Sequence, residues 1–202
     1  QEATRVDVDS SAQRGQSAWC HYLLSRAEIL AGRPQAAMRP LRAARLLAKG
    51  SAEEALLGDR IERNLAFLAI GQLRVGAGQR LIEKLIVRSQ RSEQWGPLSE
   101  DYSTLSVCVG MRGDYARASA VLELAVDCAQ RARHPQRLLL TMLGLATIET
   151  SLGRLDRAQA VLRDCAPLVE AGYTEYLCLH AFLIRGELAF EQARFDEARQ
   201  QF

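Results

Sequence analysis

Two histidines lie beside cysteines, and such a pair could bind a metal ion or form a nucleophile and its base. Cys20 precedes His21, and Cys178 lies two residues before His180. On a helix, side chains share a face when they are three or four residues apart, so neither pair fits one metal ion. No third, orienting group is evident for a cysteine nucleophile. We predict no metal site and interpret both pairs as helix residues, a core cysteine beside a partly exposed histidine.

Four carboxylates could be paired for general acid–base catalysis, which needs acidic side chains near one reacting group. Glu53 stands next to Glu54, and Asp156 and Glu197 are a second possible pair. Each lies where a helix is expected to begin, and a carboxylate in the first turn is stabilised by the positive end of the helix dipole. We therefore interpret all four as helix-start residues.

The remaining chemical signals also have structural interpretations. The glycine cluster Gly76-Ala77-Gly78-Gln79 lacks the Gly-x-x-x-x-Gly-Lys-Ser/Thr pattern of a phosphate loop and follows a predicted helix. We predict a hairpin turn there. His134 precedes Pro135 at an expected helix start, which favours a structural role. Without a catalytic constellation, we predict that the chain is not an enzyme and uses no cofactor.

The composition indicates an all-α protein. Hydrophobic residues make up 48% of the 202 residues but aromatic residues only 6%, which suits closely packed helices rich in Ala and Leu. No β-branched stretch with two-residue alternation stands between turn residues. No run of residues has the length and hydrophobicity of a membrane helix, and no signal peptide is evident. Because the sequence begins with Gln1 and ends inside a pattern at Phe202, we expect a piece of a longer protein.

The five cysteines favour a reducing compartment. Their number is odd, their spacing is wide, and there is no Cys-x-x-Cys. Most lie among apolar helical residues, as buried free thiols do. We therefore expect a cytoplasmic protein.

The charged residues give little support to a nucleic-acid partner. The formal net charge is +2, and Lys49 and Lys84 are the only lysines among 26 basic residues. Arginine suits phosphate and carboxylate, but a coding bias that favours Arg and Ala together explains this preference. The arginines are interleaved with Asp and Glu, which is typical of a solvated helix surface. We expect no nucleic-acid binding by this segment and no membrane binding.

A short pattern recurs at 40-residue intervals. It is Gly113-Asp114-Tyr115-Ala116-Arg117-Ala118, then Gly153 to Ala158, then Ala193 to Ala198. A weaker copy begins at Gly32, and a degenerate one begins at Gly76. The glycine is interpreted as the left-handed residue that ends a helix, and the alanine five residues later as the small residue where two helices cross. Each copy therefore predicts a helix–turn–helix hairpin.

Five hairpins are expected in a single domain covering 14–202, after a polar tail or the end of a preceding helix at 1–13. Their approximate ranges are 15–50, 51–95, 96–134, 135–172 and 173–202, the last one truncated. Ser51 with Glu54 predicts a capping box at the start of the second hairpin. Pro34 suits the opening turn of a helix, whereas Pro40 is expected to kink one.

These residues resemble the tetratricopeptide repeat (TPR). The resemblance covers nearly the whole chain, with repeats longer than the ~34 residues usual for that family. The clearest matches are Tyr102, Leu105, Ser106, Gly113, Tyr115, Ala118, Leu122 and Ala125 in the third hairpin, and Met142, Leu145, Ala146, Gly153, Leu155, Ala158, Leu162 and Cys165 in the fourth. The resemblance implies an α-α superhelix, or solenoid, of antiparallel helix pairs. The longer period looks like that of the sensor domains in bacterial maltose-regulator-like LuxR-type activators.

In the TPR family the first helix of each pair lines the concave side of the array. Carried over by offset, the resemblance implies these groove residues: Trp19, Tyr22 and Arg26; Arg63 and Ile70; Glu100, Ser103 and Val107; Leu143 and Thr147; and His180, Leu183 and Glu187. No run of basic or amide residues supports a carboxylate clamp. The apolar share would suit an amphipathic helix. It would equally suit packing against a further superhelical turn or other domains.

Three functions are therefore weighed. The first is a non-catalytic protein- or peptide-binding scaffold within a larger bacterial signalling or regulatory protein, and it is preferred. The second is an effector-sensing domain of a LuxR-type ATP-dependent transcriptional activator that binds a small molecule. The third, an enzyme or an RNA-binding array, is least favoured. The sequence does not identify the partner or the oligomeric state.

Overall fold

The computed structural model describes residues 2–172 and 175–202, with side chains at 11–172 and 176–202. Within these residues the chain forms ten α-helices and no strand, which confirms the predicted all-α class. The helices are α1 (Glu2–Leu30), α2 (Pro34–Ala48), α3 (Glu54–Gly71), α4 (Val75–Arg91), α5 (Trp95–Gly110), α6 (Tyr115–Arg131), α7 (Pro135–Ser151), α8 (Leu155–Glu170), α9 (Glu175–Glu191) and α10 (Phe195–Gln201).

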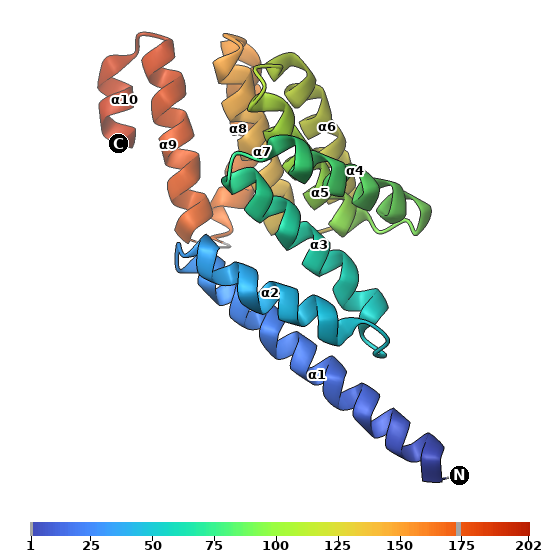
Figure 1. Ribbon diagram of the computed structural model, residues 1–202. Helices are drawn as coiled ribbons and strands as arrows, with labels where there is room; N and C mark the ends of the chain where they lie inside the picture. The colour runs from blue at the N-terminus through green and yellow to red at the C-terminus, as the bar shows by residue number, and fades with distance from the viewer. Residues whose placement is uncertain (1, 173–174) are drawn as a thin grey trace. The chain divides into compact units, whose positions relative to one another are not determined.

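The helices belong to two compact units, Gln1–Leu85 and Ile86–Phe202, and the division falls within α4. In the first unit α1 packs along α2, and both contact α3 (Figure 1). In the second unit the hairpins α5–α6, α7–α8 and α9–α10 each pack within themselves. Neighbouring hairpins of this unit are joined by the contacts of α7 with α5 and α9. The first helices of successive hairpins are therefore neighbours in space.

The N-terminal boundary differs from the sequence prediction. A polar tail or the end of a preceding helix was expected at residues 1–13, but α1 begins at Glu2 and continues without a break to Leu30. No Gly or Pro that would end a helix stands between Glu2 and Arg14. Polar composition alone therefore did not mark a helix boundary here.

The first helix of every hairpin ends in the same way. One residue takes a positive φ, and the next donates its backbone N–H to the carbonyl five residues earlier, as in a Schellman motif. These donor–acceptor pairs are Arg33 to Glu28, Arg74 to Ala69, Asp114 to Val109, Arg154 to Glu149 and Arg194 to Ala189. The left-handed residues are Gly32, Leu73, Gly113, Gly153 and Ala193. From Leu73 onward they are spaced by 40 residues throughout.

This regularity corrects the prediction for the second hairpin. A turn was expected at Gly76–Gln79, but Gly76 lies in the first turn of α4, which starts at Val75. The left-handed position belongs to Leu73, with φ 60°. The sequence pattern misplaced this turn because a leucine occupies the position where the first, third and fourth hairpins have glycine. The second repeat is therefore in phase with the three that follow.

Side chains cap the starts of α6 and α7. Asp114 Oδ1 accepts from the Arg117 backbone N–H at 3.1 Å at the start of α6. His134 Nδ1 accepts from the Arg137 backbone N–H at 3.3 Å at the start of α7. Each bond satisfies an N–H that has no partner within the helix. The structural role predicted for His134 is confirmed.

The capping box predicted from Ser51 and Glu54 takes a different form. In such a box Ser51 would be the N-cap, and Glu54 would accept from its N–H. Instead Glu53 precedes the first helical residue of α3, and Glu54 Oε2 accepts from Gly50 N–H at 2.6 Å. Ser51 Oγ accepts from Glu53 N–H at 3.3 Å. The helix begins later than expected because residues 51–53 form a turn of their own.

The small residues predicted at the helix crossings are buried. Ala37, Ala118 and Ala158 are fully buried, and Ala198 is 3% exposed. The first-unit core gathers residues of α1, α2 and α3 around Leu41, Leu57 and Ile61. A second-unit core gathers residues of α7, α8 and α9 around Leu143, Leu162 and Ile184. Burial of these apolar side chains holds neighbouring hairpins together.

We predict that Leu73→Gly stabilises the protein. A left-handed conformation costs an L-residue about 1–2 kcal/mol, and glycine lacks the Cβ responsible for this strain. Leu73 is 79% exposed, so little burial is lost. Because glycine also raises the entropy of the unfolded chain, the expected gain in unfolding free energy is about 0.5–1 kcal/mol. Urea denaturation measures it.

The matched control is Gly113→Ala at the equivalent turn, which should lower the unfolding free energy by about 1 kcal/mol. No atom lies within 4 Å of a Cβ built on Gly113, so its effect comes from the backbone alone. If Leu73→Gly destabilised the protein as much as Gly113→Ala does, the assignment of Leu73 as the strained turn residue would be wrong.

Candidate binding surface

The thirteen predicted groove residues differ in how far they are exposed to solvent. Arg26, Val107, Leu183 and Glu187 are exposed. Trp19, Glu100, Ser103, Thr147 and His180 are half-buried. Tyr22, Arg63, Ile70 and Leu143 are buried. The two units must be considered separately, since each positions its own first helices.

In the first unit, the predicted residues Trp19 and Tyr22 connect helices. Trp19 Nε1 donates to Glu53 Oε2 at 3.1 Å, which ties α1 to the segment just before α3. The Arg60 guanidinium lies 5.7 Å from the centre of the Trp19 ring, and Trp19 meets Tyr22 edge-on at 5.7 Å. Glu53, considered above as an acid–base residue, is thus a hydrogen-bond acceptor for a half-buried tryptophan. These contacts serve the packing of α1 on α3.

In the second unit, α5, α7 and α9 present positions that repeat every 40 residues. Glu100 on α5, Leu140 on α7 and His180 on α9 are equivalent, and so are Val107, Thr147 and Glu187. Because α7 contacts both α5 and α9 (Figure 1), these positions belong to neighbouring helices of one unit. We call Glu100, Val107, Leu140, Thr147, His180, Leu183 and Glu187 the first-helix face.

Leu140 is a surface residue that the sequence pattern did not single out. It is 42% exposed, whereas the predicted Leu143 is fully buried in the core with Leu162 and Ile184. The groove residues predicted on α7 began at Leu143, the equivalent of Ser103 and Leu183. They therefore omitted Leu140, which lies three residues earlier. Strict 40-residue counting from Glu100 or His180 reaches Leu140 directly.

Apolar and polar side chains alternate on the first-helix face. Val107 is 51% exposed and Leu183 41%. Arg137 Nη2 on α7 donates to Glu100 Oε2 on α5 at 3.2 Å, in an ion pair that links the two helices. The side chain of His180 lies 6.1 Å from that of Tyr176, ring centre to ring centre, and its Nδ1 is buried without a hydrogen bond. The face can therefore offer both apolar contact and hydrogen bonding.

Behind this face, α7 carries a fully buried carboxylate, Glu149. Ser119 Oγ on α6 donates to Glu149 Oε1, and Arg157 Nη1 on α8 lies 3.5 Å from the same oxygen. Glu149 Oε2 lacks a hydrogen bond but lies 3.5 Å from Arg154 Nη1. Arg157 also pairs with Glu123 on α6. This network connects two consecutive hairpins through charge as well as apolar packing.

The cysteines are free thiols in the structure. Cys108, Cys128 and Cys165 are buried, and burial raises the pKa of Cys128 and raises that of Cys165 to about 12. Such thiols stay protonated at neutral pH and are poor nucleophiles. Cys20 is exposed, and Cys178 Sγ lies 3.6 Å from the Val169 carbonyl oxygen. Among the described residues, no group of three or more His, Cys, Asp or Glu could hold a metal ion.

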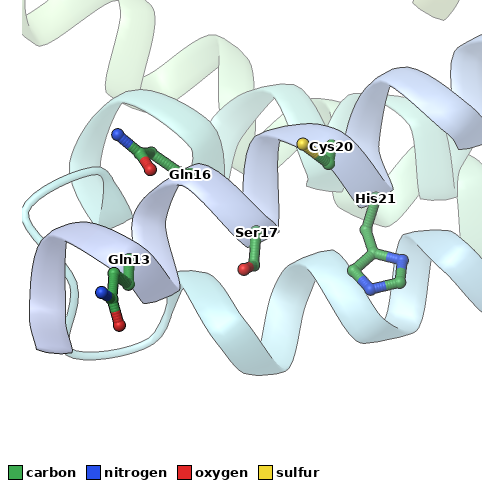
Figure 2. A pocket seen from close by; sticks show the side chains of 5 residues that line it. All are labelled: Gln13, Gln16, Ser17, Cys20 and His21. Atoms are coloured by element: carbon green, nitrogen blue, oxygen red, sulfur yellow. The ribbon is translucent and has the colours of Figure 1, made fainter.

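An open pocket of about 470 Å³ lies along α1 and is lined by Gln13, Gln16, Ser17, Cys20 and His21. Figure 2 shows these five side chains along successive turns of α1. The pocket lies in the first unit, on the helix that carries Trp19 and Tyr22. Its lining side chains are polar except for the thiol, and all come from one helix, so it is a shallow surface feature.

The fold is of the TPR-like class. No known protein family and no curated protein matches the sequence. Similar structures include BtubC from P. vanneervenii, with a TM-score of 0.73 and 18% identity over 99% of this chain and 82% of that one. Apo RapI has a TM-score of 0.71 and 15% identity over 96% of this chain and 52% of its own.

A third similar structure is a point variant of a kinesin-light-chain-like protein of Podosopora anserina with nearly identical TPR-like repeats. It has a TM-score of 0.69 and 17% identity over 95% of this chain and 92% of its own. The predicted TPR-like repeat architecture is thereby confirmed. None of the helices within the described residues combines the length and the hydrophobicity that a membrane-spanning segment needs.

We predict that Glu149→Ala lowers the unfolding free energy by about 1–3 kcal/mol, because it leaves the buried Ser119 hydroxyl without its acceptor. Arg154 and Arg157 are 47% and 45% exposed, so water can solvate them when the carboxylate is removed. The loss should thus stay below the ~3–5 kcal/mol expected for breaking a fully buried ion pair. Chemical denaturation measures the difference.

Glu123→Ala is the control, since it removes the exposed partner of Arg157 and should change stability by at most about 1 kcal/mol. The side chain of Glu123 is 48% exposed. Equal losses for the two variants would contradict the distinction between the buried and the exposed carboxylate.

We predict that the thiols react with Ellman's reagent in two classes. In the native protein near neutral pH, Cys20 should react first because its side chain is exposed. Cys165 should react only after unfolding, since burial excludes the reagent and raises the thiol pKa to about 12. Absorbance measured with and without denaturant separates the classes. Cys20→Ser should remove the fast phase, and a fast phase that persists would disprove its assignment.

Proposed function

We propose that the chain is a non-catalytic scaffold that binds a protein or peptide on the first-helix face of the second unit. The observation that carries the proposal is the exposure of Val107, Leu140 and Leu183, one on each of the neighbouring helices α5, α7 and α9. In the 40-residue register they occupy positions three and seven residues apart, which share one helix face. One exposed apolar side chain on the same face of each neighbouring first helix is suited to a partner that runs across the repeats. The TPR-like fold of the similar structures supports this choice.

The chemistry of the face favours an amphipathic helical segment as the ligand. Apolar side chains of the ligand would pack against Leu140 and Leu183, as in the helix-in-groove mode. Polar groups of Thr147 and Glu187 would contact its polar edge and fix its register. Burial of each leucine would contribute about 1 kcal/mol or more to binding.

The biological setting belongs to the same proposal. The 40-residue spacing of the turns supports a place within a larger, cytoplasmic bacterial signalling or regulatory protein. The alternative is an effector-sensing domain of a LuxR-type ATP-dependent activator. A small effector would need an enclosed pocket, whereas the pocket on α1 is open. The exposed leucines of the first-helix face favour a protein or peptide partner.

The test uses Leu140→Glu and Leu183→Glu, separately and together. Partners captured from the source cells by the wild-type chain are identified by mass spectrometry and then titrated as pure proteins. Each glutamate introduces a charge into an apolar contact, so each should weaken binding at least about tenfold. Circular dichroism and the melting temperature should remain unchanged, because both leucines are exposed in the free protein.

Leu124→Glu is the matched control. Leu124 lies on α6, a second helix, and is 49% exposed, compared with 42% for Leu140 and 41% for Leu183. It should bind the partner as the wild type does. Binding that survives the Leu140→Glu, Leu183→Glu double variant would refute the first-helix face as the site, and the absence of any direct partner would refute the scaffold.

A further inference from the structure

A second surface with different chemistry lies on α2. Arg39, Arg42, Arg45 and Lys49 are all exposed along this helix and its C-cap. The segment from Arg33 to Gly50 contains five basic residues and no acidic one, more than the net charge of +2 on the whole chain. None of the carboxylates whose side chains the structure describes forms an ion pair with any of the four. We call Arg39, Arg42, Leu46 and Lys49 the α2 basic face.

Two basic residues on second helices of the second unit have acidic partners within that unit. On α6, Arg131 pairs with Asp127 at 3.0 Å. On α8, Arg157 pairs with Glu123 of α6. The helix dipole favours Arg45 and Lys49 near the C-terminus of α2, but it does not account for Arg39 and Arg42 farther from that end. Like charges spaced three residues apart also repel one another along a helix. The basic face is thus unfavourable for the isolated helix and needs another explanation.

An exposed leucine lies among these charges. Leu46 is 76% exposed. At 3.6 residues per turn, Arg39, Arg42, Leu46 and Lys49 fall within about 80° of the helix circumference. An arginine fork can bind a carboxylate through two hydrogen bonds. The face therefore offers several carboxylate-binding groups around one apolar contact.

We propose that the α2 basic face docks an acidic amphipathic helix of a partner protein. Glutamates or aspartates at helical spacing would pair with Arg39, Arg42 and Lys49, and an apolar residue of the same segment would cover Leu46. The proposal is independent of the first-helix face, because α2 lies in the other unit.

The dimensions and the apolar centre favour such a segment over a nucleic acid. The three basic residues of the face, from Arg39 to Lys49, extend over about 15 Å, at 1.5 Å per residue. A protein that makes roughly six to ten phosphate contacts with DNA uses at least twice as many basic groups as this face offers. A phosphate backbone also has no counterpart for Leu46. An acidic helix matches both the length of the face and its apolar centre.

The probe is a fluorescently labelled, designed helical peptide of about 15 residues, with glutamates flanking a leucine stripe, titrated with the full chain at physiological salt. Fluorescence anisotropy should show saturable binding. Arg39→Glu with Arg42→Glu should weaken it at least about tenfold, since both carboxylate contacts become repulsive. Leu46→Gln should weaken it a few-fold, as expected for the loss of one apolar contact.

Arg163→Glu with Arg199→Glu is the matched control. Both arginines are exposed in the second unit, and the double variant changes the net charge by the same amount. It should alter the affinity by less than about twofold. An equal loss in the control would show that only net charge matters and would overturn the proposal. A peptide whose glutamates are replaced by glutamines should bind more weakly than the acidic peptide. If the two peptides bound equally well, the proposal would also be overturned.

Two further probes test other ligands of the basic face. A single-stranded oligonucleotide of similar charge, and vesicles containing anionic phosphatidylserine, are titrated in parallel. Tighter binding of either one, lost in the Arg39→Glu, Arg42→Glu variant, would assign the face to phosphate and overturn the protein-segment proposal. Leu140→Glu with Leu183→Glu should leave peptide binding unchanged, so failure of the first-helix face and failure of the α2 basic face give different results.

Discussion

The left-handed residue that ends each first helix determines how the rest of the molecule is arranged. A single residue with positive φ completes the Schellman motif, and the chain then reverses direction and begins the second helix. From Leu73 to Ala193 this event recurs every 40 residues, at glycine or not. Equal spacing gives α5, α7 and α9 equivalent positions, and their contacts make these positions neighbours. The first-helix face exists because the turns keep this register.

The sequence predicted the hairpins where the turn has a distinctive residue. Gly113 and Gly153 mark their turns because glycine alone adopts positive φ without strain. Leu73 gives no such signal in the sequence, because its strain is offset by packing and hydrogen bonds elsewhere. The turn was predicted at Gly76 instead, because glycines lie nearby. Leu140 was missed for a related reason: which leucine of α7 is buried depends on the rotation of the helix against α8 and α9. Helix periodicity alone does not define that rotation.

Charged side chains are arranged differently on α2 and around Glu149 in the second unit. In the second unit, acidic and basic side chains meet across hairpins, and Glu149 is fully buried among Ser119, Arg154 and Arg157. On α2 the basic side chains are exposed to solvent without a partner among the carboxylates that the structure describes. Paired charges contribute to the joining of repeats, whereas unpaired like charges repel one another. A charge pattern that does not help the fold is best explained by binding to something outside it.

The groups with potential for chemistry are mostly engaged in holding helices together. Glu53 accepts a hydrogen bond from Trp19, and Glu197 pairs with Arg194 in the first turn of α10. Cys165 is packed in the core and its thiol pKa is raised to about 12. Catalysis requires a group whose protonation state and position leave it ready to react. The first-helix face and the α2 basic face instead expose leucines, a valine and arginines, which act through contact area and charge. This is the physical basis for proposing recognition by two chemically different faces.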